Sequence, residues 1–364
     1  MSVAVIGGGI NGIFSAWCLA SNGYNVDLFE ADKLLEKTSS ASSKLLHGGI
    51  RYLEQGHFGL VRESLKDRAW WLKNAPHATR SIKICMPVYR NSSRGLLKLF
   101  VGAQAYRLLA GKFSLGPSGL LKYNQLIQSY SELKDNNLVG AVTFYDGQMN
   151  EESLGLWVRD KAVEAGVKIH EDEKVNSFNS AGYISTELNL SKRYHYVINA
   201  TGPWAAELNN KNNIDSRFSL ELVRGSHLLI NHKIQGSYLF QDPSSKRVVY
   251  ALDYFGNVLV GTTEVIQENP DKTICSDAER DFLIKIFNDH FTHNIGHKDI
   301  IREYSGLRPI LCRKGKSFKS NFSFASREAE IEVIDRLITI YGGKWTSAPS
   351  LSKKVLKKVN QMGV

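Results

Sequence analysis

The 364-residue sequence predicts an α/β fold in which a parallel sheet is interrupted by α+β insertions that build a second domain. Residues 2–30 are predicted to form a strand, a tight glycine turn, a helix and a second strand, which is a βαβ unit. Segments 222–230 and 248–264 alternate apolar and polar residues as antiparallel strands do, and the second contains a Phe-Gly-Asn hairpin turn. Apolar strands at 194–199 and 337–341 indicate that the first sheet resumes after each insertion.

The other elements follow from the spacing of apolar residues. We predict helices at 59–74, 154–165, 276–290 and 351–359, a strand at 166–170, and a less regular region from 75 to 140. The chain then divides into a discontinuous nucleotide-binding domain and a substrate or cap domain with a mixed or antiparallel sheet. The first comprises residues 1–75, 141–215 and 300–364, and the second comprises residues 76–140 and 216–299.

The composition is that of a globular protein with a basic excess. Hydrophobic residues make up 43% of the chain, and 46 basic against 36 acidic residues give a net charge of +10. This charge favours an anionic partner, such as nucleic acid, acidic lipid or a phosphorylated metabolite. Residues 301–364 hold 13 basic and 5 acidic residues, or +8 of the total, so the charge does not coat the surface evenly. Within them, segment 351–359 (LSKKVLKKV) is most simply a terminal helix with a solvated lysine face.

Cysteine usage and the chain start bear on the compartment. Cys18, Cys85, Cys275 and Cys312 are widely separated and form no C-x-x-C pair, which argues against a zinc site, a redox dithiol and a disulfide framework. The amino terminus lacks the basic region of a signal peptide, and no segment approaches the length of an apolar membrane span. We therefore expect a cytoplasmic protein without a bound metal.

A glycine-rich turn marks a nucleotide-binding site. Gly7, Gly9 and Gly12 form G-x-G-x-x-G directly after a strand and at the start of a helix. Gly7 permits the tight turn, Gly9 lets the backbone approach a pyrophosphate, and Gly12 lets the helix pack on the strand. Glu30 ends the second strand, where a carboxylate accepts hydrogen bonds from a ribose and disfavours the 2′-phosphate of NADP. The motif leaves the choice between FAD and NAD open.

Two later turns belong to the same edge of the sheet. Segment 200–204 (ATGPW) ends a predicted strand, where small residues bring the backbone close to a long cofactor. Segment 341–345 (YGGKW) joins the last strand to the last helix, and its glycines leave helix amides and Lys344 open to negative charge. Taken alone, each segment is equally well explained as an ordinary connection.

Four blocks resemble the flavin-dependent glycerol-3-phosphate dehydrogenases, within the superfamily of glycine oxidase and D-amino-acid oxidase. They are residues 38–54 (TSSASSKLLHGGIRYLE), 199–204 (NATGPW), 224–230 with 261–264 (RGSHLLI and GTTE), and 304–310 with 341–345 (YSGLRPI and YGGKW). The blocks occur in order over almost the whole chain. The resemblance implies a Rossmann-like FAD-binding domain and FAD as the cofactor.

The resemblance also implies which residues form the site. Ser39, Ser40, Ser42, Ser43 and Lys44 match a serine-rich loop along the flavin diphosphate, and His47, Gly48 and Gly49 match a segment beside the flavin ring. With these, the predicted cofactor-binding residues are Gly7, Gly9, Asn11, Gly12, Glu30, Ala200, Thr201, Gly202, Trp204, Gly342, Gly343, Lys344 and Trp345. The residues that match positions around the substrate are Arg51, Tyr52, His227, Arg308 and Lys344.

The chemistry of an alcohol oxidation agrees with the substrate set. The reaction removes a hydroxyl proton and transfers a hydride, so the site needs a base and cations near a phosphate dianion. His227 is the candidate base because histidine titrates near neutral pH, and Lys344 is placed to assist an alkoxide or the reduced flavin. Arg308 and Arg51 can grip phosphate oxygens through planar forks, and Tyr52 adds a hydroxyl. His227, Arg308 and Lys344 are the predicted catalytic residues.

The sequence departs from the family pattern in three places. After YGGKW it continues with 346–350 (TSAPS), where the family has threonines, a tyrosine and an arginine. The strand before GTTE carries 250–256 (YALDYFG) without an isoleucine-proline-tryptophan step. The printed chain stops soon after the last predicted helix, without the helical carboxyl-terminal domain of typical bacterial members.

Three functions stay open at this point. The first and preferred one is oxidation of sn-glycerol 3-phosphate to dihydroxyacetone phosphate, with electrons passed to quinone or another acceptor. The second keeps the flavin but acts on another 2-hydroxy acid, phosphorylated polyol or amino acid, as the TSAPS departure suggests. The third is a basic membrane- or nucleic-acid-binding protein without redox activity, which bound yellow flavin together with an absence of salt-sensitive nucleic-acid binding would exclude. Under the first, no nucleic-acid partner is expected.

A contact with the inner face of the cell membrane is the remaining expectation. Quinone is a lipid-phase acceptor, and segment 94–112 mixes Leu97, Phe100, Val101 and Leu108 with cations, as an interfacial helix does. Packing inside the second domain explains the same pattern equally well.

Overall fold

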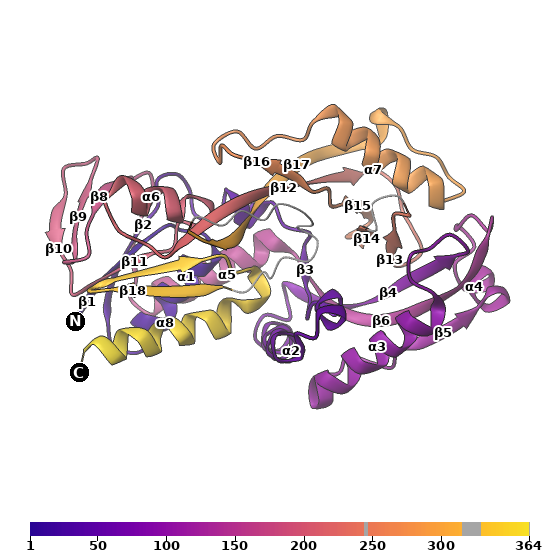
Figure 1. Cartoon of the computed structure of the whole chain (residues 1–364), viewed down its shortest axis with the longest axis horizontal. Helices are drawn as coiled ribbons and strands as arrows, with labels where there is room; N and C mark the ends of the chain where they lie inside the picture. Colours follow the sequence, from indigo (N-terminus) through magenta and orange to yellow (C-terminus); the bar gives the residue numbers. More distant parts are fainter. Residues whose placement is uncertain (244–246, 315–328, 364) are drawn as a thin grey trace.

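The computed structural model describes residues 1–243, 247–314 and 329–363, and it contains two large sheets (Figure 1). The smaller of the two has six strands, and its amino-terminal strand lies near the middle. In spatial order they are β18 (Glu330–Ile334), β19 (Leu337–Tyr341), β11 (Tyr196–Asn199), β1 (Ser2–Ile6), β2 (Asn25–Phe29) and β7 (Lys168–His170). All neighbours are parallel except β18 and β19, as the βαβ pattern predicted.

The larger sheet has ten strands and is almost wholly antiparallel; β4 and β13 are its parallel pair. Its main path is β16 (Val265–Gln267), β12 (Phe218–Ile230), β15 (Asn257–Gly261), β14 (Val248–Tyr254), β13 (Ser237–Gln241), β4 (Thr79–Tyr89), β6 (Leu138–Met149) and β3 (Leu45–Leu46). Off this path, β17 (Ile300–Arg313) pairs with β12, and β5 (Gly119–Lys122) pairs with β6. The predicted hairpin of β14 and β15 is confirmed.

Helices cover both sheets, and a small three-stranded sheet lies at one end. The helices are α1 (Ile10–Ala20), α2 (Phe58–Asn74), α3 (Leu96–Ala110), α4 (Tyr123–Ser129), α5 (Glu151–Glu164), α6 (Ala205–Lys211), α7 (Asp277–His290) and α8 (Ala348–Met362). The small sheet is formed by β8 (Val175–Phe178), β9 (Tyr183–Thr186) and β10 (Ser191–Arg193). Among the described residues, no helix combines the length and apolar character needed to cross a membrane.

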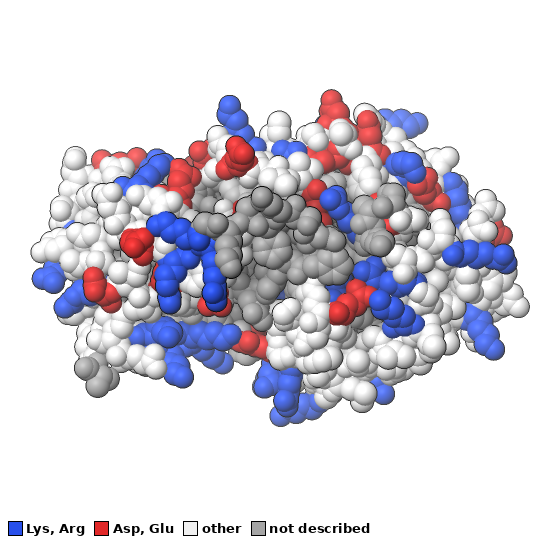
Figure 2. Space-filling view, in the orientation of Figure 1, with Lys and Arg blue, Asp and Glu red and all other residues white. Residues whose placement is uncertain are grey.

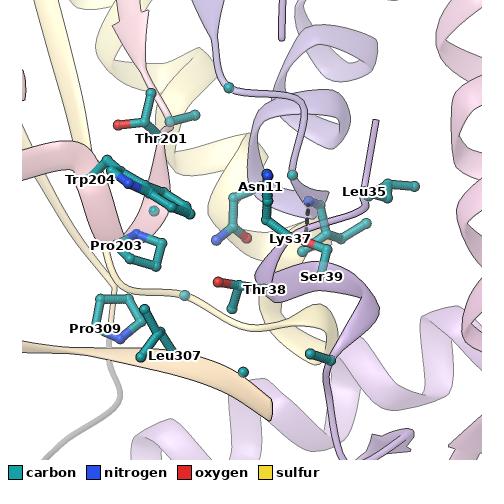
Figure 3. Close-up of a pocket in the computed structure, with 18 of the residues that line it drawn as sticks. Asn11, Leu35, Lys37, Thr38, Ser39, Thr201, Pro203, Trp204, Leu307 and Pro309 are labelled. Carbon is teal, nitrogen blue, oxygen red and sulfur yellow. Dashed lines mark hydrogen bonds between the residues drawn. The ribbon is translucent and has the colours of Figure 1, made fainter. Parts of the chain in front are cut away.

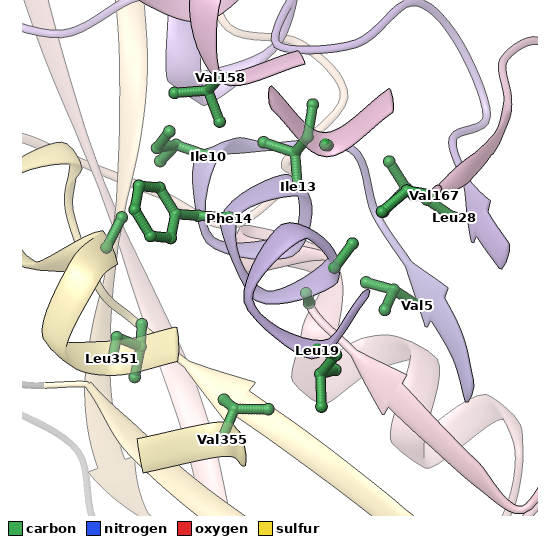
Figure 4. Close-up of a cluster of buried hydrophobic side chains, with 14 of the residues drawn as sticks. Val5, Ile10, Ile13, Phe14, Leu19, Leu28, Val158, Val167, Leu351 and Val355 are labelled. Atoms are coloured by element: carbon green, nitrogen blue, oxygen red, sulfur yellow. The ribbon is translucent and has the colours of Figure 1, made fainter. Parts of the chain in front are cut away.

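The hydrophobic core beside the six-stranded sheet is built around α1 (Figure 4). Ile13 and Leu19 of α1 are fully buried, and the apolar stripe of α8 packs against the same helix through Val355 and Val359. Each such side chain contributes roughly 1.5–3 kcal/mol when it leaves water. Because α1 and α8 come from opposite ends of the chain, this packing joins the first and last elements of the nucleotide-binding unit.

The long strands β12 and β17 connect the two halves of the molecule. They run side by side from the six-stranded sheet to the region of α7 (Figure 1). Their antiparallel pairing extends from Phe218 opposite Arg313 to Ile230 opposite Ile300. This ladder therefore carries residues of one domain to the edge of the other.

The structure corrects one sequence prediction and adds a strand that the sequence did not reveal. The prediction of a less regular region at 75–140 is wrong, because it holds β4, α3, β5 and α4. β17 was not predicted as a strand; its partner is β12 in the large sheet, although the predicted boundaries gave residues 300–313 to the nucleotide-binding domain. Strand β6 likewise begins at Leu138 and lies in the large sheet. Pro309 and Gly306, both rare inside strands, explain why sequence patterns did not reveal β17.

The close approach of α1 to β1 gives a stability prediction. A Cβ at Gly12 would lie 1.9 Å from the carbonyl oxygen of Gly7, so Gly12→Ala forces the helix away from the strand. We expect it to lower the free energy of unfolding by about 2–3 kcal/mol in chemical denaturation. The control is Gly102→Ala in α3, where a Cβ meets nothing within 4 Å. It should raise that free energy by up to about 1 kcal/mol, and a matching loss in both variants would contradict the explanation.

Candidate active site

A cavity of about 570 Å³ opens at the carboxyl ends of β1, β2 and β11. Figure 3 shows its walls: Asn11 with Lys37–Ser39 on one side, Thr201–Trp204 on another, and Leu307 with Pro309 of β17 below. The turn after β19 and the strand β12 complete the lining through Lys344 and His227. A volume of this size is in the range of cofactor and small-molecule sites.

The glycine turn gives the cavity its phosphate-binding character. Gly7 has a φ of +102°, and a Cβ there would lie 2.7 Å from the carbonyl oxygen of Ala200, so the turn requires glycine. Gly9 has only the Ser39 hydroxyl nearby, which leaves the backbone open to the cavity. The carboxylate of Glu30 accepts hydrogen bonds from the backbone N–H of Gly8 at 2.6 Å and of Asp32 at 3.1 Å.

Two tryptophans and the serine-rich loop hold together the part of the cavity wall formed by the turn after β19 and the start of α1. The buried indole N–H of Trp71 donates to the backbone oxygens of Trp345 and Thr346, at 3.1 and 3.2 Å. Trp345 in turn donates to the backbone oxygen of Ser39 at 2.9 Å, and the Ser39 hydroxyl accepts from the N–H of Ile10 at 3.0 Å. These bonds tie α2, the last turn, the serine-rich loop and α1 into one frame.

A pair of glycines lies in the wall made by β12 and β17. Gly225 and Gly306 lie opposite each other in the ladder, His227 lies opposite Tyr304 on one side of them, and Arg308 lies opposite Val223 on the other. Directly paired residues, and residues two apart, share a face of a sheet. The histidine and the arginine are therefore on the same face, separated by a position without side chains.

His227 is a buried and neutral imidazole. It is 3% exposed, stacks on the ring of Tyr304 at a centroid distance of 5.1 Å, and its Nε2 lies 2.8 Å from the hydroxyl of Ser43. Burial, followed by the nearby cations Arg308 and Lys44, lowers the pKa of His227 well below its usual 6.5. The side chain is thus unprotonated at neutral pH and can accept a proton.

Arg308 is held across the backbone of β12. Its Nη2 donates to the hydroxyl of Thr262 at 2.5 Å, and its Nη1 donates to the backbone oxygen of Thr263 at 3.3 Å. A Cβ on Gly225 would lie 2.2 Å from Nη2, so the guanidinium occupies the space that glycine leaves. The fixed guanidinium presents a positive charge to the cavity that it lines.

Lys344 follows the double glycine after β19 and lines the cavity. Its Nζ lies 5.4 Å from the ring centroid of Tyr52, which is buried. Asp67 of α2 is another charged group near Lys344; burial raises its pKa to about 6, although Ser350 donates a hydrogen bond to it at 2.5 Å. The lysine therefore lies between the cavity and a buried carboxyl group.

A buried carboxylate braces β12 beside His227. Glu279 of α7 accepts hydrogen bonds from the hydroxyls of Thr263 and Ser226, at 2.6 and 2.7 Å, and from Arg224 at 2.7 Å. It also closes the capping box with Ser276 that starts α7. Burial alone would raise the pKa of Glu279, but these hydrogen bonds outweigh it and hold the pKa at about 2.

Most of the predicted site residues come together in this cavity. Those that line it are Gly7, Gly9, Asn11, Glu30, Ser39, Ser42, Ser43, His47, Ala200, Thr201, Gly202, Trp204, His227, Arg308, Gly342, Gly343, Lys344 and Trp345. Those that do not line it are Gly12, Ser40, Lys44, Gly48, Gly49, Arg51 and Tyr52. Gly12 serves the helix packing described above, and the Ser40 hydroxyl donates to backbone oxygens of its own turn.

Lys44 faces Glu151 rather than the cavity. The two form a buried ion pair, and Glu151 also accepts a hydrogen bond from Ser42. Burial lowers the pKa of Lys44 and raises that of Glu151, against the attraction within the pair. The lysine thereby fixes the serine-rich loop to the start of α5.

The Gly48 backbone is held by a second buried ionic cluster. Its N–H donates to the hydroxyl of Tyr106 at 2.7 Å, and that hydroxyl donates to Asp146 at 2.9 Å. Arg68 pairs with Asp146 at 3.1 Å. A Cβ at Gly48 would lie 2.4 Å from the Tyr106 oxygen, so the segment 47–49 can pass here only with glycine.

Sequence reasoning missed the residues that position the predicted ones. Thr262 and Thr263 hold Arg308, Tyr304 stacks on His227, and Gly225 makes room for the guanidinium. All four lie in the blocks RGSHLLI, GTTE and YSGLRPI, so the signal was present as motif membership. Their roles depend on the pairing of β12 with β17, which no local pattern revealed.

Comparisons with known proteins agree with this architecture. The family of FAD dependent oxidoreductases (DAO) matches residues 2–354. The chain therefore belongs to the FAD-dependent oxidoreductase family, and its cofactor is FAD.

Its relatives within that family are glycerol-3-phosphate dehydrogenases. The enzyme of Pseudomonas tolaasii is 30% identical over 377 residues, which cover 98% of this chain and 71% of the relative. The aerobic enzyme of Bacillus subtilis is 30% identical over 370 residues, covering 98% of this chain and 66% of the relative. This chain thus spans about two thirds of the length of these relatives.

Solved structures share the fold. A glycerol-3-phosphate dehydrogenase from Bacillus halodurans, complexed with FAD, superposes with a TM-score of 0.78 at 22% identity, covering 99% of this chain and 64% of that one. An L-alpha-glycerophosphate oxidase from Mycoplasma pneumoniae with FAD bound gives 0.79 at 18% identity, covering 99% and 95%. Glycine oxidase from Geobacillus kaustophilus gives 0.77 at 18% identity, covering 99% and 94%.

The residues of the cavity fit FAD. Gly7 and Gly9 leave room for a pyrophosphate at the start of α1, and Glu30 offers a carboxylate to a ribose. The buried Oδ1 of Asn11 has no hydrogen-bond partner among the residues that the structure describes, so a polar group of the cofactor can satisfy it.

The brace at Glu279 gives a pH-dependent stability prediction. Its folded-state pKa of about 2 is below the usual 4.5, so the unfolded chain binds more protons in acid. The stabilisation is complete above pH 4.5 and is lost as the pH falls towards 2. We expect Glu279→Gln to lower the free energy of unfolding by about 2–3 kcal/mol at pH 7, measured by urea denaturation. The difference from wild type should shrink below pH 4.5, and a pH-independent difference would contradict the explanation.

Proposed function

We propose that the protein oxidises sn-glycerol 3-phosphate to dihydroxyacetone phosphate. The observation that carries the proposal is the placement of His227 and Arg308 on one face of the wall made by β12 and β17, where they offer a neutral base and a fixed cation to the FAD cavity. A secondary alcohol beside a phosphate ester requires this combination. The names of the two glycerol-3-phosphate dehydrogenase relatives support the same substrate.

His227 accepts the hydroxyl proton in this mechanism. A neutral imidazole has one unprotonated nitrogen, and its low pKa keeps that form dominant at neutral pH. Ser43 holds Nε2, and Nδ1 is buried without a hydrogen-bond partner among the described residues. Protonation adds a charge near Arg308 and Lys44, and a bound phosphate dianion offsets part of that repulsion.

Arg308 and Lys344 bind and orient the anion. Thr262 and Thr263 hold the guanidinium rigidly, so little side-chain entropy is lost when phosphate oxygens contact it. Lys344 lines the same cavity and stabilises negative charge on the alkoxide oxygen. Bound FAD supplies the isoalloxazine ring that accepts a hydride from the carbinol carbon.

The function is tested by anaerobic titration of the FAD-loaded protein with sn-glycerol 3-phosphate, followed by flavin absorbance. Wild type should bleach fully. His227→Asn should slow the reduction by about 10²–10⁴-fold, the usual contribution of a general base. Arg308→Gln should weaken substrate binding by about tenfold or more, because a charge-assisted contact is lost. The control His232→Asn removes an imidazole outside the cavity and should behave as wild type.

Two outcomes decide against the substrate. Absence of bleaching by sn-glycerol 3-phosphate overturns the proposal. So does a panel in which lactate, glycerol or glycine reduces the flavin faster, which would favour an unphosphorylated substrate. The segment TSAPS motivates the panel, and its Thr346 lines the cavity.

The electrons pass, in this proposal, to quinone or another acceptor at the inner face of the cell membrane, where α3 contacts the lipid. Leu97, Val101 and Leu108 of α3 are 76%, 59% and 72% exposed, while Ala103 and Tyr106 are buried against the large sheet. Lys98 and Arg107 lie among the exposed apolar residues. An apolar stripe flanked by cations is typical of a helix on an anionic lipid surface.

Vesicle co-sedimentation tests this contact. Wild type should sediment with phosphatidylcholine vesicles that contain phosphatidylglycerol and less with pure phosphatidylcholine. The double variant Leu97→Glu, Val101→Glu should lose about tenfold in affinity for the vesicles, because two apolar side chains that would contact lipid are replaced by charged ones. The control Leu156→Glu, Val163→Glu changes two exposed apolar residues of α5 and should bind as wild type. Equal binding by all three proteins would contradict the role of α3.

A further inference from the structure

A second cavity of about 510 Å³ lies between α2, α8 and β18. None of its lining residues belongs to the glycine turn, to β12 or to β17. Lys344 lines both cavities, so the second one begins where the first one ends. Nothing in the oxidation chemistry described above uses it.

One face of α8 supplies most of its charge. Ser350, Lys354, Lys357, Lys358 and Gln361 line the cavity, and their spacing of three or four residues places them on one side of the helix. The apolar stripe of α8 packs against α1 instead. Figure 2 shows lysines gathered along α8 on this face of the molecule. The lysines that the sequence favoured as a simple solvated face thus border a hollow.

The balance of charge in the cavity is positive. Lys344, Lys354, Lys357 and Lys358 face two carboxylates, Glu63 and Glu330, so four positive minus two negative charges leave +2. Lys354 pairs with Glu63 at 2.7 Å. Ser347 and Ser350 also line the cavity, but their hydroxyl groups already donate hydrogen bonds, to the backbone oxygen of Lys344 and to Asp67.

An unsatisfied hydroxyl group points to a ligand independently of the charge. Ser64 of α2 lines the cavity and is 1% exposed. Its Oγ has no hydrogen-bond partner among the residues that the structure describes. Buried polar groups in native proteins are nearly always paired, so a buried hydroxyl on a cavity wall indicates a polar atom of a bound molecule.

We propose that this second cavity binds a small phosphate-bearing molecule, through the ammonium groups of Lys357 and Lys358 and the hydroxyl of Ser64. Lysine is a point-charge donor for phosphate, and a serine hydroxyl donates to a phosphate oxygen without adding charge. The molecule acts at a distance from the oxidation chemistry, and Lys344 is the shared residue through which the two cavities influence each other.

The test is calorimetric titration of the FAD-loaded protein with inorganic phosphate, at fixed ionic strength. It is performed in the Arg308→Gln background, which weakens phosphate binding in the first cavity. Ser64→Ala and Lys357→Gln should each raise the Kd by about three- to tenfold, the usual effect of losing one polar contact to an anion. The matched control Lys353→Gln removes the same charge from the same helix at a position that does not line the cavity, and its Kd should stay unchanged. Unchanged melting temperatures show that each variant is folded.

Each other outcome overturns the proposal. Loss of all phosphate binding in Arg308→Gln assigns the phosphate to the first cavity, which supports the proposed substrate and removes the second site. Equal Kd values for Lys357→Gln and Lys353→Gln show that binding is non-specific attraction to the helix. Equal affinity for succinate shows selection for any dianion rather than phosphate. Binding that persists in Arg308→Gln and weakens in Ser64→Ala supports the second site even where sn-glycerol 3-phosphate fails to reduce the flavin.

Discussion

The antiparallel pairing of β12 with β17 is the constraint on which the active site depends. It places His227 opposite Tyr304 and Gly225 opposite Gly306, so an imidazole, a pair of glycines and a guanidinium follow one another on one face. A slip of one residue would turn the paired side chains to opposite faces and separate them. The same pairing brings β17 to the serine-rich loop, where a Cβ on Gly306 would lie 2.5 Å from the carbonyl oxygen of Ala41. Register, rather than any single contact, thus joins the cofactor cavity to the groups that act on substrate.

Burial gives the charged groups of this region their separate roles. His227 is neutral because it is buried among cations, whereas Glu279 stays ionised because four side chains donate hydrogen bonds to it. The two groups lie close together, because Glu279 of α7 binds Ser226 of β12, the neighbour of His227. A neutral base and an ionised brace therefore coexist within a few residues. The difference in protonation state between the two groups follows from the number of hydrogen bonds that each one accepts.

Local sequence patterns predicted the elements whose signals are short-range. The βαβ unit with Gly7, Gly9 and Gly12, the β14–β15 hairpin and the terminal helix each carry their turn or their periodicity in a few residues. Strand β17 and the region 75–140 escaped prediction because their strands contain Pro87 and Pro309, whose strand conformation is imposed by long-range pairing. Among the site residues, motif matching could propose Lys44 as a cofactor contact. Only the fold shows that Glu151, more than a hundred residues away, holds it instead.

The frame around the first cavity has a thermodynamic consequence. Asn11 donates to the backbone oxygen of Gly342 at 3.1 Å, so the walls that enclose the FAD come from the two ends of the chain, 331 residues apart. A molecule that contacts both walls binds the folded chain and not the unfolded one, so its binding adds to the free energy of unfolding by mass action. A free FAD concentration of a thousand times Kd adds about 4 kcal/mol to the free energy of unfolding, which is a large share of the stability of a typical domain. The melting temperature of this protein is therefore a measure of how much FAD it carries.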